Sequence, residues 1–508
     1  MVTPSRAKSA LPTVPCEDSD AAAGPLARSF GLFATEWRRF IAVGALMLVD
    51  VATVLGCLAL LWAVRSSPLF GLRAAYGPVY PFSVYVSNLY FLLPWVLAFA
   101  ESGLYTRRAL FWDETRQAIR ACTMAALFGV FLTFTVRPAE ELSRLVLLGT
   151  WLATLFAVPL LRYNAKRVLA AAGLWNKRVL ILGAGETGQQ VLGRIRGNHS
   201  LGYEPVALVD DDPEKIGSQH AGLPIRGPLT SVPELVQKFG VKDVVVAMPR
   251  LSRERLLHVI SICEGHVESI RIVPDMFGLA TVGVETEDLD GMLLLNMRWN
   301  LAKPWNLWLK RSFDLIVATA TVVALAPVLL LVALAIRFDS PGPVLFIQQR
   351  LGRGWQRFRC VKFRTMFTDN EQRLGEHLAH SPAARLEWER FAKLKAFDPR
   401  VTRVGWILRR LSLDELPQLL NVFSGHMSLV GPRPYLPSEI ERMGDFAETI
   451  LKAPPGLTGL WQVSLRNELT FDQRLRLDEY YVRNWSLWTD IIVLVKTFGA
   501  VLRREGAY

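Results

Sequence analysis

The chain has few cysteines and few charged residues for its length. Its five cysteines form no CxxC pair, which argues against a disulfide framework and against a cysteine-based zinc site. Only 20% of the 508 residues are charged, whereas 51% are hydrophobic, and this balance excludes a disordered or fibrous protein. The length exceeds what one core can serve, so we expect about three domains, some of them in lipid.

The first 38 residues lack the apolar core of a cleaved signal peptide and are rich in Ala, Ser and Pro. We therefore interpret residues 1–38 as a cytoplasmic tail. Across the whole chain, 58 Lys and Arg outnumber 46 Asp and Glu, which gives a net charge of +12. Such an excess favours an anionic partner, for example a phospholipid surface, a nucleotide or a polyphosphate.

Four apolar runs predict a bundle of four transmembrane helices over residues 39–162. A membrane helix needs roughly 20 residues, so the two shorter runs depend on snorkelling of flanking arginines, Arg162 among them. Basic residues gather on the tail, the second loop and the exit, which predicts cytoplasmic ends for the bundle. The runs cover residues 40–64, 79–100, 121–136 and 145–161.

Asp50 is the one carboxylate inside these four runs. An ionisable group within a membrane helix is a candidate functional group, so Asp50 could belong to a relay or a channel. A hydrogen bond between helices, or a hydrated position, is the simpler interpretation. Because the other runs carry no charge, the sequence argues against a transporter.

The middle of the chain, residues 163–297, alternates between predicted strands and helices. The apolar strand at 178–182 leads directly into a GxGxxG segment that opens a helix. This order predicts a doubly wound, Rossmann-like α/β domain. NAD or another nucleotide could bind there, and the alternative is a purely structural or oligomerising role. The candidate nucleotide-binding residues are Gly183, Gly185, Gly188 and Asp210.

A fifth charge-free run, residues 315–336 of a predicted helix at 315–337, contains Pro327 near its middle. Proline removes a backbone hydrogen bond and kinks or breaks a helix. We therefore predict a re-entrant membrane helix that enters and leaves on the same side. The alternative is a kinked fifth span, which would place everything after it outside the cell.

Six cations lie within fifteen residues after this run, interleaved with aromatic residues. The alternation at 358–364 predicts a strand that places several cations along one face, as a phosphate-bearing ligand requires. The alternative is a basic surface that faces lipid headgroups. These cations are Arg350, Arg353, Arg357, Arg359, Lys362 and Arg364.

Asp414 and Glu415 are adjacent carboxylates at the predicted start of a short amphipathic helix. Ser412 with Glu415 fits a capping box, and Asp414 could itself cap the helix. The functional alternative is phosphoryl transfer, in which one carboxylate attacks phosphorus while the other binds Mg2+ or handles a proton. Farther on, Pro432 and Pro434 hold Arg433 in a stiff loop that suits a phosphate contact.

Six ordered motifs over the last 200 residues together resemble the bacterial sugar transferase family, also called the polyprenyl-phosphate hexose-1-phosphate transferases. Four preceding spans and a Rossmann-like domain resemble its long-form members. The motifs are AlaPro at 326–327, GlnGlnArgLeuGlyArg at 348–353, LysPheArgThrMet at 362–366, SerLeuAspGluLeuProGlnLeuLeuAsnVal at 412–422, SerLeuValGlyProArgPro at 428–434 and ProGlyLeuThrGlyLeuTrpGln at 455–462.

This resemblance implies an α/β catalytic domain at 305–508 on the cytoplasmic face of the bacterial inner membrane. The implied reaction moves hexose 1-phosphate from a UDP-hexose to undecaprenyl phosphate and releases UMP, which begins O-antigen, capsule or exopolysaccharide units. UDP-galactose is favoured over UDP-glucose. Oligomerisation is possible under this resemblance, and nucleic acid is not an expected partner.

The resemblance also implies roles for individual residues. Asp414 would be the nucleophile that forms an acyl phosphate, and Glu415, with Asp414, would bind Mg2+. Arg433 would hold a substrate phosphate, helped by three cations of the basic run, Lys362, Arg364 and Arg353. Two rival classes remain, a membrane-anchored nucleotide-sugar dehydratase and a nucleotide-sensing scaffold. The dehydratase would need a TyrxxxLys pair, which the sequence lacks.

Overall fold

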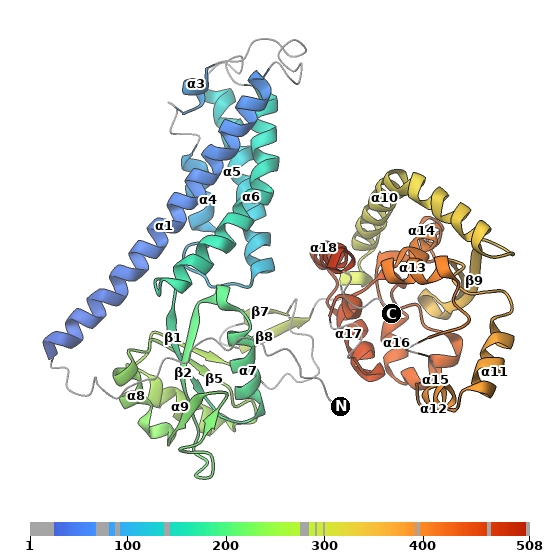
Figure 1. Cartoon of the computed structure of the whole chain (residues 1–508). Coiled ribbons are helices and arrows are strands. Elements are labelled where there is room, and N and C mark those ends of the chain that lie inside the picture. The colour runs from blue at the N-terminus through green and yellow to red at the C-terminus, as the bar shows by residue number, and fades with distance from the viewer. Residues whose placement is uncertain are drawn as a thin grey trace, which may run out of the picture. The chain divides into compact units, whose positions relative to one another are not determined.

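The computed structural model describes residues 25–67, 81–86, 92–136, 143–274, 284–289, 292–297, 300–391, 394, 397–464 and 469–503. The chain divides into two compact units, residues 1–275 and 276–508. Figure 1 shows the long helices and the sheet of the first unit, and the mainly helical second unit. We describe each unit by itself.

Helices α1, α4, α5 and α6 of the first unit share one buried core, to which Leu46, Phe99, Ala121 and Val158 contribute. Trp175, which follows α6, joins the same core. The helices are α1 Pro25–Ser66, α3 Phe82–Val86, α4 Leu93–Glu101, α5 Phe111–Val136 and α6 Arg144–Ala171.

Two of the four predicted spans, the first and the fourth, are helices long and apolar enough to cross a bilayer, at Phe40–Ser66 and Arg144–Ala171. The second predicted span contains α3 and α4, and residues 87–91 between them lie outside the described residues. The third predicted span lies within α5, which begins ten residues earlier. The helix α1 begins at Pro25, inside the segment that we had interpreted as a tail.

A buried ion network joins three of these helices. Arg162 of α6 bonds to Asp50 of α1, and its Nε lies 3.0 Å from Glu114 Oε1 of α5. Lys166 Nζ lies 2.7 Å from the same Glu114 oxygen. Asp50 is 2% and Arg162 1% exposed, so the prediction that Arg162 snorkels outward is wrong. Asp50 therefore makes the helix–helix contact that was the simpler interpretation, because a buried charge requires such a partner.

The rest of the first unit is a six-stranded sheet in the order β3-β4-β2-β1-β5-β6. All neighbouring strands are parallel except the β3–β4 edge pair, and α7, α8 and α9 follow β1, β4 and β5, which confirms a mixed Rossmann-like α/β domain. The bounds are β1 Lys177–Leu182, α7 Glu186–Arg196, β2 Tyr203–Val209, β3 Gln219–His220, β4 Leu223–Arg226, α8 Val232–Phe239, β5 Asp243–Val246, α9 Arg253–Cys263 and β6 Ser269–Ile272.

The glycines of the GxGxxG segment allow the tight passage from β1 into α7. Gly183 has a φ of +104°, a conformation that side chains rarely adopt. A Cβ on Gly188 would lie 1.9 Å from the carbonyl oxygen of Gly183. Gly183 and Gly188 therefore have a packing reason that does not require a ligand, whereas nothing lies within 4 Å of a Cβ on Gly185.

The second unit begins with the antiparallel pair β7 and β8, residues that the sequence analysis had assigned to the middle domain. A long helix, an antiparallel hairpin and a set of short helices around the parallel pair β11–β12 follow. The bounds are β7 Val284–Leu289, β8 Met292–Met297, α10 Pro304–Asp339, β9 Leu345–Leu351, β10 Arg357–Phe363, α11 Asn370–His380, α12 Pro382–Phe391, α13 Arg403–Leu411, α14 Leu419–Phe423, β11 Ser428–Val430, α15 Ile440–Met443, α16 Phe446–Ile450, β12 Gly456–Thr458, α17 Phe471–Arg483 and α18 Leu487–Arg503.

The first half of α10 is fixed to this unit by buried charges. Lys310 Nζ donates to Asp490 Oδ2 of α18 at 2.7 Å and to the carbonyl oxygen of Val430 at 3.0 Å. One helical turn later, Asp314 accepts the Ser428 hydroxyl at 2.7 Å. Lys310, Asp314 and Asp490 are each at most 3% exposed. These bonds hold α10 against β11 and α18.

The second half of α10 returns to the same unit. Ile336 packs with Phe363 of β10 and Leu408 of α13, and Asp339 Oδ2 accepts the backbone N–H of Val404 at 3.1 Å. Figure 1 shows α10 bent between its two halves, and Pro327 lies inside the helix. The helix is apolar enough to cross a membrane, and only 6% of its most apolar 18-residue window is buried. An apolar helix thus projects from the unit while both of its ends are attached to it.

The glycine at 188 provides a test of the first unit. Gly188→Ala should lower the melting temperature of the purified protein in detergent, because relieving the contact with Gly183 costs about 1–3 kcal/mol. Gly193→Ala in the same helix is the matched control, since nothing lies within 4 Å of its Cβ position. That change should be neutral or stabilising by up to about 1 kcal/mol. Equal melting temperatures for the two variants would contradict the packing argument.

Candidate active site

The hairpin β9–β10 carries the basic run, and its register separates the cations. The predicted strand is present, but Arg357 and Arg359 lie on its exposed face, whereas Lys362 lies on the opposite face. Arg350 of β9 pairs with Phe358 and so shares the face of Lys362. Arg357 and Arg359 therefore share one face while Lys362 and Arg350 share the other, because residues an odd number apart point to opposite sides of a strand.

Asp414 and Glu415 lie in a 3-10 helix, Leu413–Gln418, that joins α13 to α14. Ser412 ends α13 in the left-handed conformation, with a φ of +54°, and its side chain makes no capping hydrogen bond. The capping-box interpretation is therefore wrong for Ser412. Instead of beginning one amphipathic helix, the two carboxylates occupy a tight turn between two helices.

The electrostatics of the pair distinguish the two carboxylates. Lys362 Nζ donates to Glu415 Oε1 at 2.8 Å, and both side chains are about one-quarter exposed. Burial and the neighbouring charge of Glu415 raise the pKa of Asp414 to about 6, while Lys362 and Arg409 oppose this rise. Asp414 is thus a half-buried carboxylate with few direct partners among the described residues.

Asn421 of α14 holds the strand that carries Lys362. Its Oδ1 accepts the N–H of Val361 at 3.0 Å, and its Nδ2 donates to the carbonyl oxygen of Arg359 at 2.7 Å. The amide therefore pairs with the free edge of β10 much as a neighbouring strand would. Through this contact the position of Lys362 depends on the helix that follows the two carboxylates.

The loop of Arg433 is fixed by close backbone contacts. A Cβ on Gly431 would lie 2.5 Å from the carbonyl oxygen of Pro454, and one on Gly456 would lie 2.1 Å from the Gly431 nitrogen. Only glycines allow β11 and β12 to approach so closely. Asp478 of α17 then accepts the backbone N–H of Arg433 at 3.0 Å, which sets the direction of the loop.

Arg364 is used differently from the expectation. Its Nη2 donates to the carbonyl oxygen and the hydroxyl of Ser340 at 2.7 and 2.9 Å, and its Nη1 donates to the carbonyl oxygen of Pro341 at 2.9 Å. The side chain is 6% exposed. These contacts attach the turn after α10 to the hairpin, so both terminal nitrogens of Arg364 are committed to the fold.

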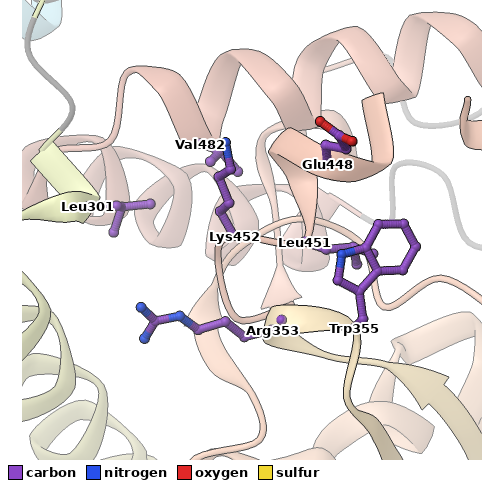
Figure 2. Close-up of a pocket in the computed structure, with 8 residues that line it drawn as sticks. Leu301, Arg353, Trp355, Glu448, Leu451, Lys452 and Val482 are labelled. Atoms are coloured by element: carbon purple, nitrogen blue, oxygen red, sulfur yellow. The ribbon is translucent and has the colours of Figure 1, made fainter. Parts of the chain in front are cut away.

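Arg353 lies in the turn between β9 and β10, at the opposite end of the hairpin from Lys362. It lines a cavity of about 550 Å³ with Trp355, Glu448 and Lys452. Figure 2 shows Arg353 and Trp355 extending in different directions from this turn. The described lining of this cavity does not include Asp414 or Glu415, so the structure does not bring Arg353 to the two carboxylates.

The donor set suits a magnesium ion only with help from a substrate. Among the described residues there is no cluster of three or more metal-ligating side chains. Mg2+ commonly takes one or two carboxylates, with substrate phosphates and water completing its shell. Asp414 and Glu415 supply such a pair of oxygen ligands. The residues present therefore fit an ion that binds together with a phosphorylated substrate.

Comparison with known proteins gives two family matches. The model described as bacterial sugar transferase matches residues 305–504, and the one described as CoA-binding domain matches residues 101–274. The UDP-galactose-lipid carrier transferase of Erwinia amylovora is 36% identical over 407 residues, which cover 80% of this chain and 84% of that relative. The chain belongs to the bacterial sugar transferase family.

Two further relatives of this sugar transferase differ in the sugar that they name. The undecaprenyl-phosphate galactose phosphotransferase of Salmonella typhimurium strain LT2 is also 36% identical, with the same coverage of both chains. The UDP-glucose:undecaprenyl-phosphate glucose-1-phosphate transferase of Xanthomonas campestris pv. campestris is 28% identical and covers 88% of this chain and 92% of its own.

The candidate nucleotide site of the sugar transferase lies in the first unit, within the CoA-binding match. Asp210 Oδ2 accepts the N–H of Ala184 at 2.8 Å, and Oδ1 accepts the N–H of Asp212 at 3.0 Å. Gly183 and Gly185 lie in the loop beside this carboxylate, and Gly188 lies in the first turn of α7. Nucleotide binding there stays a prediction, and Asp210 already serves the loop itself.

Several residues that hold the site were not found from the sequence. Arg409 lies five residues before Asp414, and its Nε donates to Thr365 Oγ1 at 3.0 Å. Its position close to the two carboxylates in the sequence could have identified Arg409 as a site residue. Asn421 stands inside a quoted motif, but the strand that it pairs with lies 60 residues away. Asp478 lies 45 residues from Arg433, and no local pattern connects them.

Hydrogen exchange can test the contact that Asn421 makes with β10. Asn421→Leu should speed amide exchange in β10, because it leaves the Val361 N–H and the Arg359 carbonyl without partners, at a cost of about 1–3 kcal/mol. Hydrogen–deuterium exchange mass spectrometry of the β10 peptide measures this. Ser424→Ala, an exposed change just after the same helix, is the control. Wild-type exchange rates in Asn421→Leu would show that β10 does not depend on this side chain.

Proposed function

We propose that this sugar transferase moves hexose 1-phosphate from a UDP-hexose to undecaprenyl phosphate and releases UMP. The observation that carries the proposal is the pair Asp414 and Glu415, held in a tight turn beside Lys362. The relatives whose names give this substrate class align with this chain over 84% of their own length. The bacterial sugar transferase match, residues 305–504, lies in the same unit as this pair.

In the first step, a carboxylate oxygen of Asp414 attacks the phosphorus that bears the sugar. The bond to the bridging oxygen breaks, its electrons leave with UMP, and an acyl phosphate of Asp414 carries the hexose. In the second step, an oxygen of undecaprenyl phosphate attacks the same phosphorus and frees the carboxylate. Covalent transfer in two steps allows one pocket to serve two bulky substrates in turn.

The neighbouring residues prepare this chemistry. Glu415 accepts a proton from an incoming phosphate, and Lys362 holds Glu415 in place. Arg433 donates to substrate phosphate oxygens from a loop that Asp478 fixes. When bound, a magnesium ion held by Asp414 and Glu415 would neutralise charge on the phosphate oxygens.

The sugar that we propose is galactose. Two of the relatives, each 36% identical, name galactose or its nucleotide, whereas relatives that name glucose are 28% to 34% identical. UDP-glucose is the second candidate donor. Measuring UMP release separately with each UDP-sugar distinguishes them by rate.

We also propose that α10 re-enters the inner membrane from the cytoplasmic side. Both ends of the helix bond to the same unit, through Lys310 at one end and Asp339 at the other. Its apolar middle, with Val323, Leu330 and Leu331 more than 60% exposed, requires a lipid environment. A crossing helix would place its two ends on opposite membrane faces, about 30 Å apart across the hydrocarbon core, and could not keep both contacts.

Cysteine labelling tests the topology of α10. Lys303→Cys precedes the helix and Ala379→Cys follows it, and both positions are exposed. In a Cys16→Ser background, both cysteines should react with an impermeant maleimide only after the cytoplasmic face is opened. Cys57, Cys122, Cys263 and Cys360 are buried and serve as the unlabelled background. Labelling of the two sites from opposite faces would contradict re-entry.

Replacement of the nucleophile tests the chemistry. Asp414→Asn should lower UMP release in nanodiscs at least a thousandfold, because an amide is a poor nucleophile, while the protein still folds and inserts. Asp472→Asn, at an exposed carboxylate in the first turn of α17, is the control and should retain wild-type activity. Substantial turnover by Asp414→Asn would remove Asp414 from its role without excluding the reaction itself.

A further inference from the structure

A second group of cations surrounds Trp461, which lies in the 3-10 helix Leu460–Val463 and is 9% exposed. The guanidinium carbon of Arg433 lies 5.8 Å from the centre of the indole ring, and that of Arg474 lies 5.4 Å from it. Arg474 belongs to α17, so three separate segments meet here. Two guanidinium groups thus share one aromatic ring.

Several donors in this group lack acceptors. Within the part of the chain that the structure describes, Trp461 Nε1 and Arg474 Nε are buried and donate to no acceptor. Arg350 Nε nearby is in the same state, although its Nη1 donates to the carbonyl oxygen of Pro434 at 3.1 Å. A buried N–H without an acceptor costs about 1–3 kcal/mol. All three groups are donors only, so what they lack is an anion or another acceptor.

The charges of the group are not balanced. Burial lowers the pKa of both Arg350 and Arg474, and the charge of Arg433 lowers each further. Glu439 lies 3.6 Å from Arg433 Nη2, but its other oxygen accepts the N–H of Leu436 at 2.7 Å. Three arginines that repel one another therefore face few acids, and a bound anion would relieve that repulsion.

The remaining acid, Asp478, supports the framework and not the guanidinium groups. Its Oδ2 accepts the backbone N–H of Arg433 at 3.0 Å and the hydroxyl of Tyr435 at 2.8 Å. Burial raises the pKa of Asp478 to about 7, which weakens its negative charge near neutral pH. Asp478 thus orients the loop while the side chain of Arg433 stays directed toward Trp461.

We propose that Arg474, together with Arg433 and the Trp461 N–H, binds a phosphate group of a substrate. Two guanidinium forks and one indole N–H match the several oxygens of a phosphate, for which arginine is well suited. The site rests on the proposed function and adds Arg474 and Trp461 to it. The phosphate group belongs either to the nucleotide diphosphate or to the lipid phosphate.

Steady-state kinetics test this site in the full chain. Arg474→Gln should raise the KM at least tenfold for one of the two substrates and change kcat less than threefold. UMP release is measured in nanodiscs with Mg2+, while UDP-galactose and undecaprenyl phosphate are varied in turn. A higher KM for UDP-galactose assigns the site to the nucleotide, and a higher KM for the lipid assigns it to the acceptor. Both KM values within twofold of wild type would overturn the proposal.

Arg476→Gln is the matched control, because Arg476 is exposed two residues farther along the same helix. It should change neither KM more than twofold. Trp461→Phe keeps an aromatic ring and removes only the N–H, so it should raise the same KM about threefold to tenfold. If Arg474→Gln fails to fold, an unchanged KM in Trp461→Phe overturns the proposal.

A binding measurement separates failure of this site from failure of the proposed reaction. UMP and inorganic pyrophosphate are added separately to the purified protein, and the melting temperature is recorded. We expect at least one of them to raise it in wild type and in Arg476→Gln but not in Arg474→Gln. No UMP release from wild type with any UDP-hexose would reject the reaction alone. Equal shifts, or no shift, in all three proteins would reject the phosphate site.

Discussion

Contacts of charged side chains at the two ends of α10 are the constraint on which the second unit depends. Lys310 and Asp314 bury their charges against β11 and α18, while Asp339 and Arg364 fix the turn that follows the helix. Removing one partner of such a pair leaves an unpaired charge in a low-dielectric interior. The apolar helix must therefore leave and return to the same surface, and the hairpin with Lys362 follows directly from its second end.

Close contacts between distant segments also fix the rest of the site. Gly431 and Gly456 let two loops meet at backbone distance, and Asn421 pairs with a strand edge. These contacts leave Asp414 with few partners of its own. Burial and the charge of Glu415 raise the pKa of Asp414, whereas Glu415 itself is held by Lys362. The pair thus combines a carboxylate that has few partners with one that is fixed by a salt bridge.

Much of the fold could be predicted from the sequence because its signals are local. The strand–glycine–helix order at 177–196 predicted the α/β domain, and long apolar runs predicted α1, α6 and α10. Local sequence patterns gave wrong predictions where a side chain pairs with a residue far away in the chain. Arg162 was expected to reach the interface, but Asp50, 112 residues away, pairs with it inside the bundle. Ser412 has a capping sequence, yet its left-handed backbone prevents the cap.

The sequence alone predicted the class of site, because Asp414, Glu415, Arg433 and Lys362 stand in ordered motifs that resemble those of the family. Only the tertiary structure decided which cations lie close to the two carboxylates. Arg364 bonds to the turn after α10, and Arg353 lies at the end of the hairpin opposite Lys362. Arg474 carries no local signal and reaches Trp461 only through the packing of α17. The sequence identifies the charged residues. Their partners depend on which distant segments pack against each other.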